Sequence, residues 1–339
     1  MTPSKRQGGP SRSGVRHLRA VASHANHWRQ TRWFRLTGFI AGTLLIVLAI
    51  TAALRQDPES IRRALHALGN HPWWFAVLFF TLPLLNWLTI SISIWILLAR
   101  FGRLGIGETL ALVGMAWMLN YLPMRPGMVG RVAYHKTVNK IGVRQTGRTL
   151  VEGVVITGVV SGVMFLGVLG LHRAPPALAW SGVVLGPLLA GFAAAAVLWQ
   201  SRPVIARYCA AGSLRVIDMA VWALRYALAF AIVGASIDLT TALVLAVASQ
   251  IAMLVPISGN GLGVREWLIG ALAASLPATA ALGGAEPQLA QGLTADVLNR
   301  VVEVLVAVPL GLVSVALIGR RLRRLGKSRA PTTEGQDLP

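Results

Sequence analysis

Two stretches decide the fold, LPMRPGMVGR at residues 122–131 and VPISGNGLGVRE at residues 255–266. Each interrupts an apolar segment, Gly107–Leu122 or Thr240–Val255, which as a helix of about 16 residues would be roughly 24 Å long. That length is less than the ~30 Å hydrocarbon core of a membrane. Because proline removes a backbone donor and glycine frees the backbone, neither stretch is expected to stay helical. Irregular backbone at membrane depth needs surrounding protein or a water-filled cavity. The sequence therefore predicts two re-entrant, broken-helix hairpins.

The two breaks resemble each other. GMVGR at residues 127–131 matches GLGVR at residues 261–265 at an offset of 134 residues, and helical stretches resume in Val132–Lys140 and Glu266–Leu276. Paired segments interrupted by Gly and Pro indicate a transporter binding site between two inverted repeats. Proline kinks in ordinary spans are the alternative. The residues expected to shape the hairpin backbone are Pro123, Gly127, Gly130, Pro256, Gly261 and Gly263.

The composition of the chain fits a polytopic membrane protein. Hydrophobic residues make up 55% of the 339 residues and charged residues 13%, about half of the ~25% charged content of soluble domains. This argues against a soluble enzyme and against a disordered protein. We therefore predict an all-α polytopic integral membrane protein with about six full transmembrane helices and two re-entrant hairpins in an inverted repeat. The expected full spans are Leu36–Leu54, Trp73–Ala99, Leu150–Leu171, Leu178–Gln200, Leu214–Ile237 and Leu293–Ile318.

Basic residues set the predicted topology. Lys and Arg number 32 against 12 Asp and Glu, a net charge of +20, and the excess lies in tails and short loops, so no nucleic acid is expected. If both segments are re-entrant, only four arginines lie on the outer side of the membrane. If both segments cross the membrane fully, seven basic residues move to the outer side. The positive-inside rule favours the first arrangement, with both termini cytoplasmic in a multi-pass inner membrane protein. We divide the chain into a mostly disordered basic tail at 1–35, a transmembrane domain at 36–319 and a basic cytoplasmic tail at 320–339.

Three stretches carry a family resemblance. They are LNYLPMRPGMVGRVAYHKTVNKIGVRQTGRTLVEGV from residue 119, LVPISGNGLGVREWLIGALAA from residue 254, and LNRVVEVLVAVPLGL from residue 298. They resemble signatures of the lysylphosphatidylglycerol synthase transmembrane, or flippase-like, domain family, without the aminoacyl-transferase domain fused to some members. The chain departs from the family's pattern at 257–260, at Arg125-Pro126 and at Gly153. The resemblance implies translocation of lipids or lipid-linked head groups between leaflets.

Charged residues inside spans are functional candidates because burying them in a membrane is expensive. Arg131 and Arg265, beside bare glycine amides, form a suitable receptor for a phosphodiester. The alternative is that each arginine forms an internal ion pair with Glu152, Glu303 or Asp218, and both readings hold if substrate competes with the acid. The predicted substrate-binding residues are Arg131, Arg265, Glu266, Arg300, Glu152, Asn260 and Ser258.

Internal pairs are expected as well. Arg300 and Glu303 lie one turn apart and can pair on one helix face. Asp218 and Arg225 lie two turns apart, which suggests a structural pair. Glu152 is a second candidate for a structural role, as an interfacial residue that caps the start of its span.

Several chemistries find no support. No GxxxxGK[ST] loop, HExxH motif or Gly-x-Ser-x-Gly triad occurs, and the single Cys209 excludes a multi-cysteine metal site. We expect no cofactor, no metal and no catalytic residue. The predicted function is a membrane transporter, a flippase whose partners are membrane lipids such as an anionic phospholipid. A membrane-embedded enzyme or scaffold acting on a phospholipid or polyprenyl phosphate is the alternative, and homo-oligomerisation stays open.

Overall fold

The structure is a computed structural model that describes residues 72–122, 125–171, 175, 181–254, 264–275 and 285–327. These residues belong to one compact unit, Ala49–Pro339, and the other unit, Met1–Leu48, lies outside the described residues. The predicted tail at 1–35 and the predicted span Leu36–Leu54 therefore fall outside them. Within the described ranges the chain is helical and contains no β-strand, so the predicted all-α class is confirmed there.

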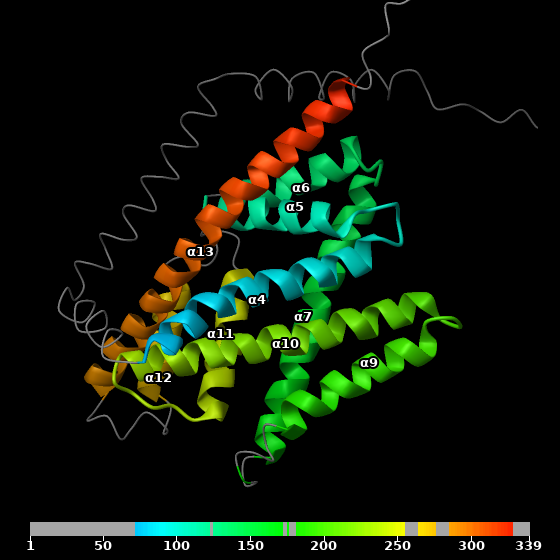
Figure 1. Cartoon of the computed structure of the whole chain (residues 1–339). Coiled ribbons are helices and arrows are strands. Elements are labelled where there is room, and N and C mark those ends of the chain that lie inside the picture. The colour runs from blue at the N-terminus through cyan, green and yellow to red at the C-terminus, as the bar shows by residue number, and fades with distance from the viewer. Residues whose placement is uncertain are drawn as a thin grey trace, which may run out of the picture. The chain divides into compact units, whose positions relative to one another are not determined.

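Ten helical elements follow one another in the described ranges (Figure 1). They are α4 (Trp73–Leu98), α5 (Ile106–Leu119), α6 (Pro126–Thr137), α7 (Val143–Leu171), the π-helical turn η1 (Ser181–Leu185), α9 (Gly186–Leu198), α10 (Pro203–Ile232), α11 (Leu239–Leu254), α12 (Val264–Ser275) and α13 (Ala285–Lys327).

Four helical segments are long and apolar enough to cross a membrane: Trp73–Leu98, Val143–Gly170, Ser181–Leu198 and Gln291–Arg324. They coincide with four of the six predicted spans. The predicted span Leu214–Ile237 lies mostly in α10, a helix of 30 residues that carries four charged side chains. Its polar content lowers its hydropathy, although most of those charges are paired inside the protein.

The helices run further than the apolar stretches. Proline at the first position of α10 starts that helix well before Leu214, since proline suits the first turn of a helix. α13 continues to Lys327, past the predicted end of the transmembrane domain at residue 319. Arginines near the end of a helix favour its extension, because they interact well with the negative end of the helix dipole.

α10 is the central helix of the unit. It packs against α4, α7, α9, α11 and α13 (Figure 1). Buried aromatic and aliphatic side chains fill these contacts, among them Phe79 of α4 and Met219 and Phe230 of α10. The outer helices differ, since α7 exposes Val155, Val159 and other apolar side chains along its length. An apolar exterior around a core that contains charges is the arrangement that a membrane allows.

The first broken segment is a hairpin. α5 and α6 pack against each other, and Nδ2 of Asn139, just after α6, donates to Oε1 of Glu108, in the first turn of α5, at 3.1 Å. The start of α5 and the residues just after α6 therefore lie close together. Between the helices, Arg125 adopts the left-handed conformation with φ 47°. The predicted interruption of the helix is confirmed here, while Pro123 lies outside the described residues.

Close packing fixes this hairpin in place. A Cβ on Gly127 of α6 would lie 2.4 Å from the backbone oxygen of Ala116 in α5. A Cβ on Gly114 of α5 would lie 2.5 Å from Oγ of Ser314 in α13. Small residues that let helices approach closely are typical of membrane interfaces.

α11 and α12, which flank the second predicted break, also contact each other. Residues 255–263 between them, including Pro256, Ser258, Asn260, Gly261 and Gly263, lie outside the described residues. Arg125 donates from Nη2 to the backbone oxygen of Met253, one residue before the end of α11. The tip of the first hairpin therefore touches the end of α11.

Several helix ends meet at one end of the unit. Nη1 of Arg207, near the start of α10, donates to the oxygen of Ile96, near the end of α4, at 3.0 Å. Nη2 of Arg321, in the last turns of α13, lies 2.9 Å from Oε2 of Glu108. Short connections join α4 to α5 and α6 to α7. The starts of α5, α7 and α10 and the ends of α4, α6 and α13 therefore lie together.

Candidate functional site

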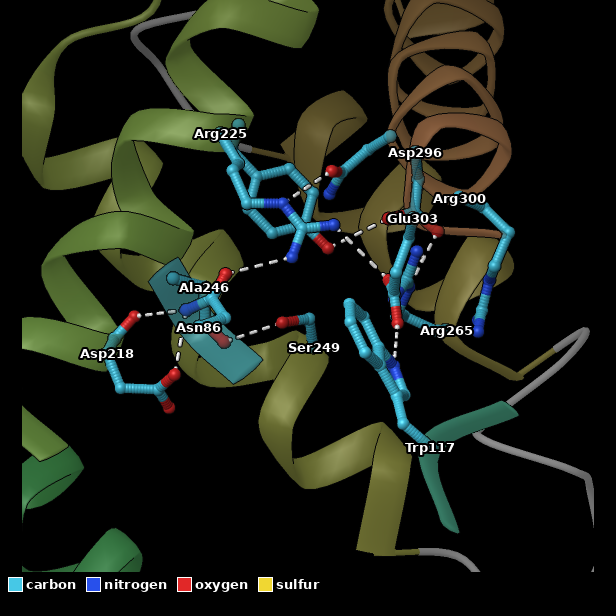
Figure 2. Close-up of polar contacts among 12 residues, drawn as sticks. Asn86, Trp117, Asp218, Arg225, Ala246, Ser249, Arg265, Asp296, Arg300 and Glu303 are labelled. Carbon is cyan, nitrogen blue, oxygen red and sulfur yellow. Dashed lines mark hydrogen bonds and ion pairs between the residues drawn. The ribbon is translucent and has the colours of Figure 1, made fainter. Parts of the chain in front are cut away.

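A buried carboxylate joins both broken segments. Glu303 of α13 is 1% exposed, and its Oε2 accepts hydrogen bonds from Nη1 of Arg265 and Nη2 of Arg225, both at 3.2 Å (Figure 2). Its Oε1 accepts from Nε1 of Trp117 at 3.3 Å. Trp117 belongs to α5, Arg225 to α10 and Arg265 to α12, so the side chain of Glu303 links these three helices to α13.

Arg265 is held on two sides by acids. Its Nε donates to Oδ2 of Asp296 at 3.0 Å, and Asp296 also accepts from the hydroxyl of Tyr226 at 2.8 Å. The Cζ atoms of Arg225 and Arg265 lie 4.0 Å and 5.5 Å from the ring centroid of Trp222, which adds a cation–π contribution. Arg265 is fully buried. The predicted internal pair with Glu303 is confirmed, and Asp296 is a second partner that the sequence analysis did not name.

Arg225 extends the network along α10. Its Nη1 donates to Oδ1 of Asn86 at 3.0 Å, and Nδ2 of Asn86 donates to Oδ1 of Asp218 at 2.7 Å (Figure 2). Asp218 pairs with Arg215 at 3.1 Å. The predicted Asp218–Arg225 pair is therefore wrong. Seven residues of helix separate the two backbones by roughly 10 Å, and Asn86 from α4 fills the space between the side chains.

Arg300 interacts electrostatically with Glu303, the acid predicted as its partner, but its ion pair is with Glu266. Nε of Arg300 donates to Oε1 of Glu266 at 3.1 Å, whereas Glu303 faces α10 and the side chain of Arg265. Helix packing decides this, since α12 brings both Glu266 and Arg265 against α13. The cluster then holds three arginines, Arg225, Arg265 and Arg300, and three carboxylates, Glu266, Asp296 and Glu303. Buried charges of equal number compensate one another.

Glu152 lies outside this cluster. It pairs with Arg100 and with Arg148, the latter at 2.8 Å, and accepts from the hydroxyl of Tyr208 at 2.7 Å. Arg100 follows the end of α4, roughly 20 Å along that helix from Asn86. Glu152 sits in the third turn of α7 rather than at its start, so the prediction of a helix cap is wrong. The residue fastens α7 to the end of α4 and to α10.

Arg131 has a different environment from Arg265. It lies in α6 and is 7% exposed, and among the described residues no hydrogen-bond acceptor or carboxylate pairs with it. One turn later, His135 is fully buried, and its Nδ1 lies 3.3 Å from Oδ1 of Asn139. Nε2 of His135 is buried with no hydrogen-bond partner in the described structure. Gly130, expected to offer a bare amide, lies inside α6, where its amide donates within the helix.

The structure thus brings only some of the predicted substrate-binding residues together. Arg265, Glu266 and Arg300 lie together, Arg131 and Glu152 lie elsewhere, and Ser258 and Asn260 fall outside the described residues. Asp296 and Asn299 share one face of α13 with the predicted Arg300 and Glu303, and their spacing of i, i+3, i+4 and i+7 marks a polar face on an apolar helix. The missed residues of the cluster are Asn86, Trp117, Trp222, Tyr226, Asp296 and Asn299.

No group of three or more His, Cys, Asp or Glu side chains able to hold a metal ion occurs among the described residues. The chain matches no protein-family model, no curated protein and no solved structure.

Proposed function

We propose that this chain is an integral membrane transporter that moves a phospholipid or a lipid-linked head group between leaflets. One observation carries the proposal: Glu303 binds Trp117 of the first hairpin and Arg265 of the second broken segment. Two interrupted helical segments that meet at buried charges are the arrangement by which transporters build a binding site near the midplane. The family resemblance in the sequence agrees with this proposal.

The distribution of basic residues supports the membrane orientation that the proposal needs. Basic residues gather where α4, α6 and α13 end, whereas the loop between α10 and α11, at the far end of α10, carries Asp238. The basic end is then cytoplasmic by the positive-inside rule. The basic residues at this end are Arg100, Arg103, Lys136, Lys140, Arg144, Arg148, Arg202, Arg207, Arg320, Arg321, Arg323 and Arg324.

In this orientation the hairpin α5–α6 enters from the cytoplasm, and α11–α12 enters from the opposite side. The contact between Arg125 and the backbone of Met253 supports a meeting of the two at their tips. In this arrangement the full transmembrane spans in the described ranges are α4, α7, η1–α9, α10 and α13. The predicted span Leu36–Leu54 would be the sixth.

The charge balance of the cluster sets a condition on the mechanism. The three arginines of the cluster already face three carboxylates, so an anionic head group gains from an arginine only by displacing an acid. In our proposal the head group passes beside the paired hairpins while its acyl chains stay in lipid. Movement of one repeat against the other opens the path alternately to each side.

Purified protein in liposomes with a fluorescent phospholipid tests the proposal. We expect the lipid to reach the other leaflet and to be recovered chemically unchanged. Conversion of the lipid to a new product by the purified protein would instead assign the chain to the enzymes, and failure to move any tested lipid would contradict the proposal.

A further inference from the structure

The two arginines that the sequence repeat makes equivalent differ in the structure. Arg265 bonds to Asp296 and Glu303, while Arg131, 7% exposed, pairs with no acceptor or carboxylate in the described part of the chain. We infer that Arg131 and His135 of α6 form a binding site for an oxyanion, and that Arg265 has a structural role. Arg131 is then the member of the pair that receives substrate.

Arg131 has no acceptor or carboxylate partner among the described residues. A buried guanidinium without an anion is a strongly unfavourable arrangement. α12 packs on α13, which supplies the acids for Arg265, but α6 packs on α5 and α7. The acid of α5 on that side, Glu108, is already engaged by Asn139 and Arg321. A ligand that brings its own negative charge compensates Arg131, and the planar guanidinium binds two oxygens of a phosphate group at once.

His135 gives the second argument. It lies four residues after Arg131, on the same face of α6. Nδ2 of Asn139 donates to Glu108, which leaves Oδ1 of Asn139 to accept from Nδ1 of His135. Nε2 of the neutral ring is then an acceptor, and it is buried without a donor among the described residues.

The two side chains together determine which chemical groups the ligand must carry. A ligand that satisfies both offers an oxyanion to Arg131 and a hydroxyl group to Nε2 of His135. Phosphatidylglycerol has this chemistry, and so does the monoanion of inorganic phosphate. The lipid as source rests on the proposed function, whereas the oxyanion site does not.

The test measures melting temperature of the purified full chain in detergent with each of three probes. Phosphatidylglycerol and inorganic phosphate separate the two sources, and phosphatidylmethanol is an anionic phosphodiester that lacks the head-group hydroxyl. At about a hundredfold excess over Kd, the binding probe should raise the melting temperature by about 4 °C. A rise with phosphate alone assigns the site to a soluble oxyanion, and a rise with phosphatidylglycerol alone assigns it to a lipid.

Matched variants identify the site. Arg131→Gln should melt no lower than the wild type without ligand and should lose the rise. Lys136→Gln removes the same charge from the exposed face of α6 and should keep the rise in melting temperature. The folded fraction of Arg265→Gln should also show this rise. Arg131→Lys retains the charge but loses the planar fork, and should bind at least tenfold more weakly.

A rise that persists in Arg131→Gln, or no rise with phosphatidylglycerol or phosphate in the wild type, would overturn the site. An equal rise with phosphatidylmethanol would overturn the part assigned to His135. The site and the proposed function fail separately: binding without lipid movement in liposomes refutes transport, and lipid movement that survives in Arg131→Gln, a variant that has lost the rise, refutes the lipid as the ligand of this site.

Discussion

Nη1 of Arg265 lies 3.2 Å from Oε2 of Glu303, and both side chains are buried between α12 and α13. The same oxygen also binds Arg225 of α10. The carboxylate of Glu303 therefore links α12, through Arg265, to the central helix α10. Because the acid is shared by two arginines, its loss leaves more charge uncompensated than the loss of an isolated pair does.

Glu303→Gln tests this arrangement. The variant leaves Arg225 and Arg265 with Asp296 as their remaining acid, so we expect the free energy of unfolding to fall by about 3–5 kcal/mol. The measurement is denaturant unfolding in detergent. The double variant Glu303→Gln/Arg225→Gln restores the charge balance and should recover more than half of the loss.

Arg148→Gln is the control for that experiment. Its side chain is 65% exposed in its pair with Glu152, and exposed pairs contribute about 0–1 kcal/mol. Equal losses in Arg148→Gln and Glu303→Gln would show that Glu303 is not a structural centre.

Asn86→Leu tests the polar bridge between α4 and α10. The substitution leaves Oδ1 of Asp218 without this donor and Nη1 of Arg225 without its acceptor. An unsatisfied buried polar group costs about 1–3 kcal/mol, and we expect a loss in that range on thermal unfolding. Thr81→Val, at an exposed position of the same helix, should stay within about 0.5 kcal/mol of the wild type, and a loss as large as that of Asn86→Leu would refute the bridge.

Two glycines of α6 form a matched pair. A Cβ on Gly127 would meet backbone atoms of Ala116 at 2.4 Å and 2.6 Å, but a Cβ on Gly130 meets nothing within 4 Å. Gly127→Ala should therefore lower the free energy of unfolding by about 1–3 kcal/mol. Gly130→Ala should be neutral or stabilising, since alanine suits a helix better than glycine. Similar melting temperatures for the two variants would contradict the tight α5–α6 hairpin.

Membrane orientation is testable by cysteine labelling in a Cys209→Ser background. Arg144, at the basic end, and Ser236, between α10 and α11, are both exposed. In intact cells an impermeant thiol reagent should label Ser236→Cys and leave Arg144→Cys unlabelled until the membrane is permeabilised. Labelling of Arg144→Cys in intact cells would reverse the proposed orientation or make the first hairpin a full span.

The sequence predicted the helices and the first break better than the partners of the charges. Apolar length, proline and glycine act locally, so α4, α7 and the interruption before α6 could be predicted from single segments. Partners depend on which helices pack together. Arg131 and Arg265 share a motif, yet among the described residues only Arg265 pairs with acids, because α12 packs on α13. Asn86 could not be chosen as the bridge to Arg225 without knowing that α4 lies on α10.

The rate at which fluorescent phosphatidylglycerol crosses the bilayer of proteoliposomes tests the central claim most directly. A reductant that quenches only the outer leaflet reports the fraction of lipid that has moved. We predict quenching well beyond the outer-leaflet half with the wild type and with Lys136→Gln, and quenching limited to that half in Arg131→Gln and in protein-free vesicles. Wild-type vesicles that behave as the protein-free ones do, while the protein is folded and inserted, would contradict lipid translocation by this chain.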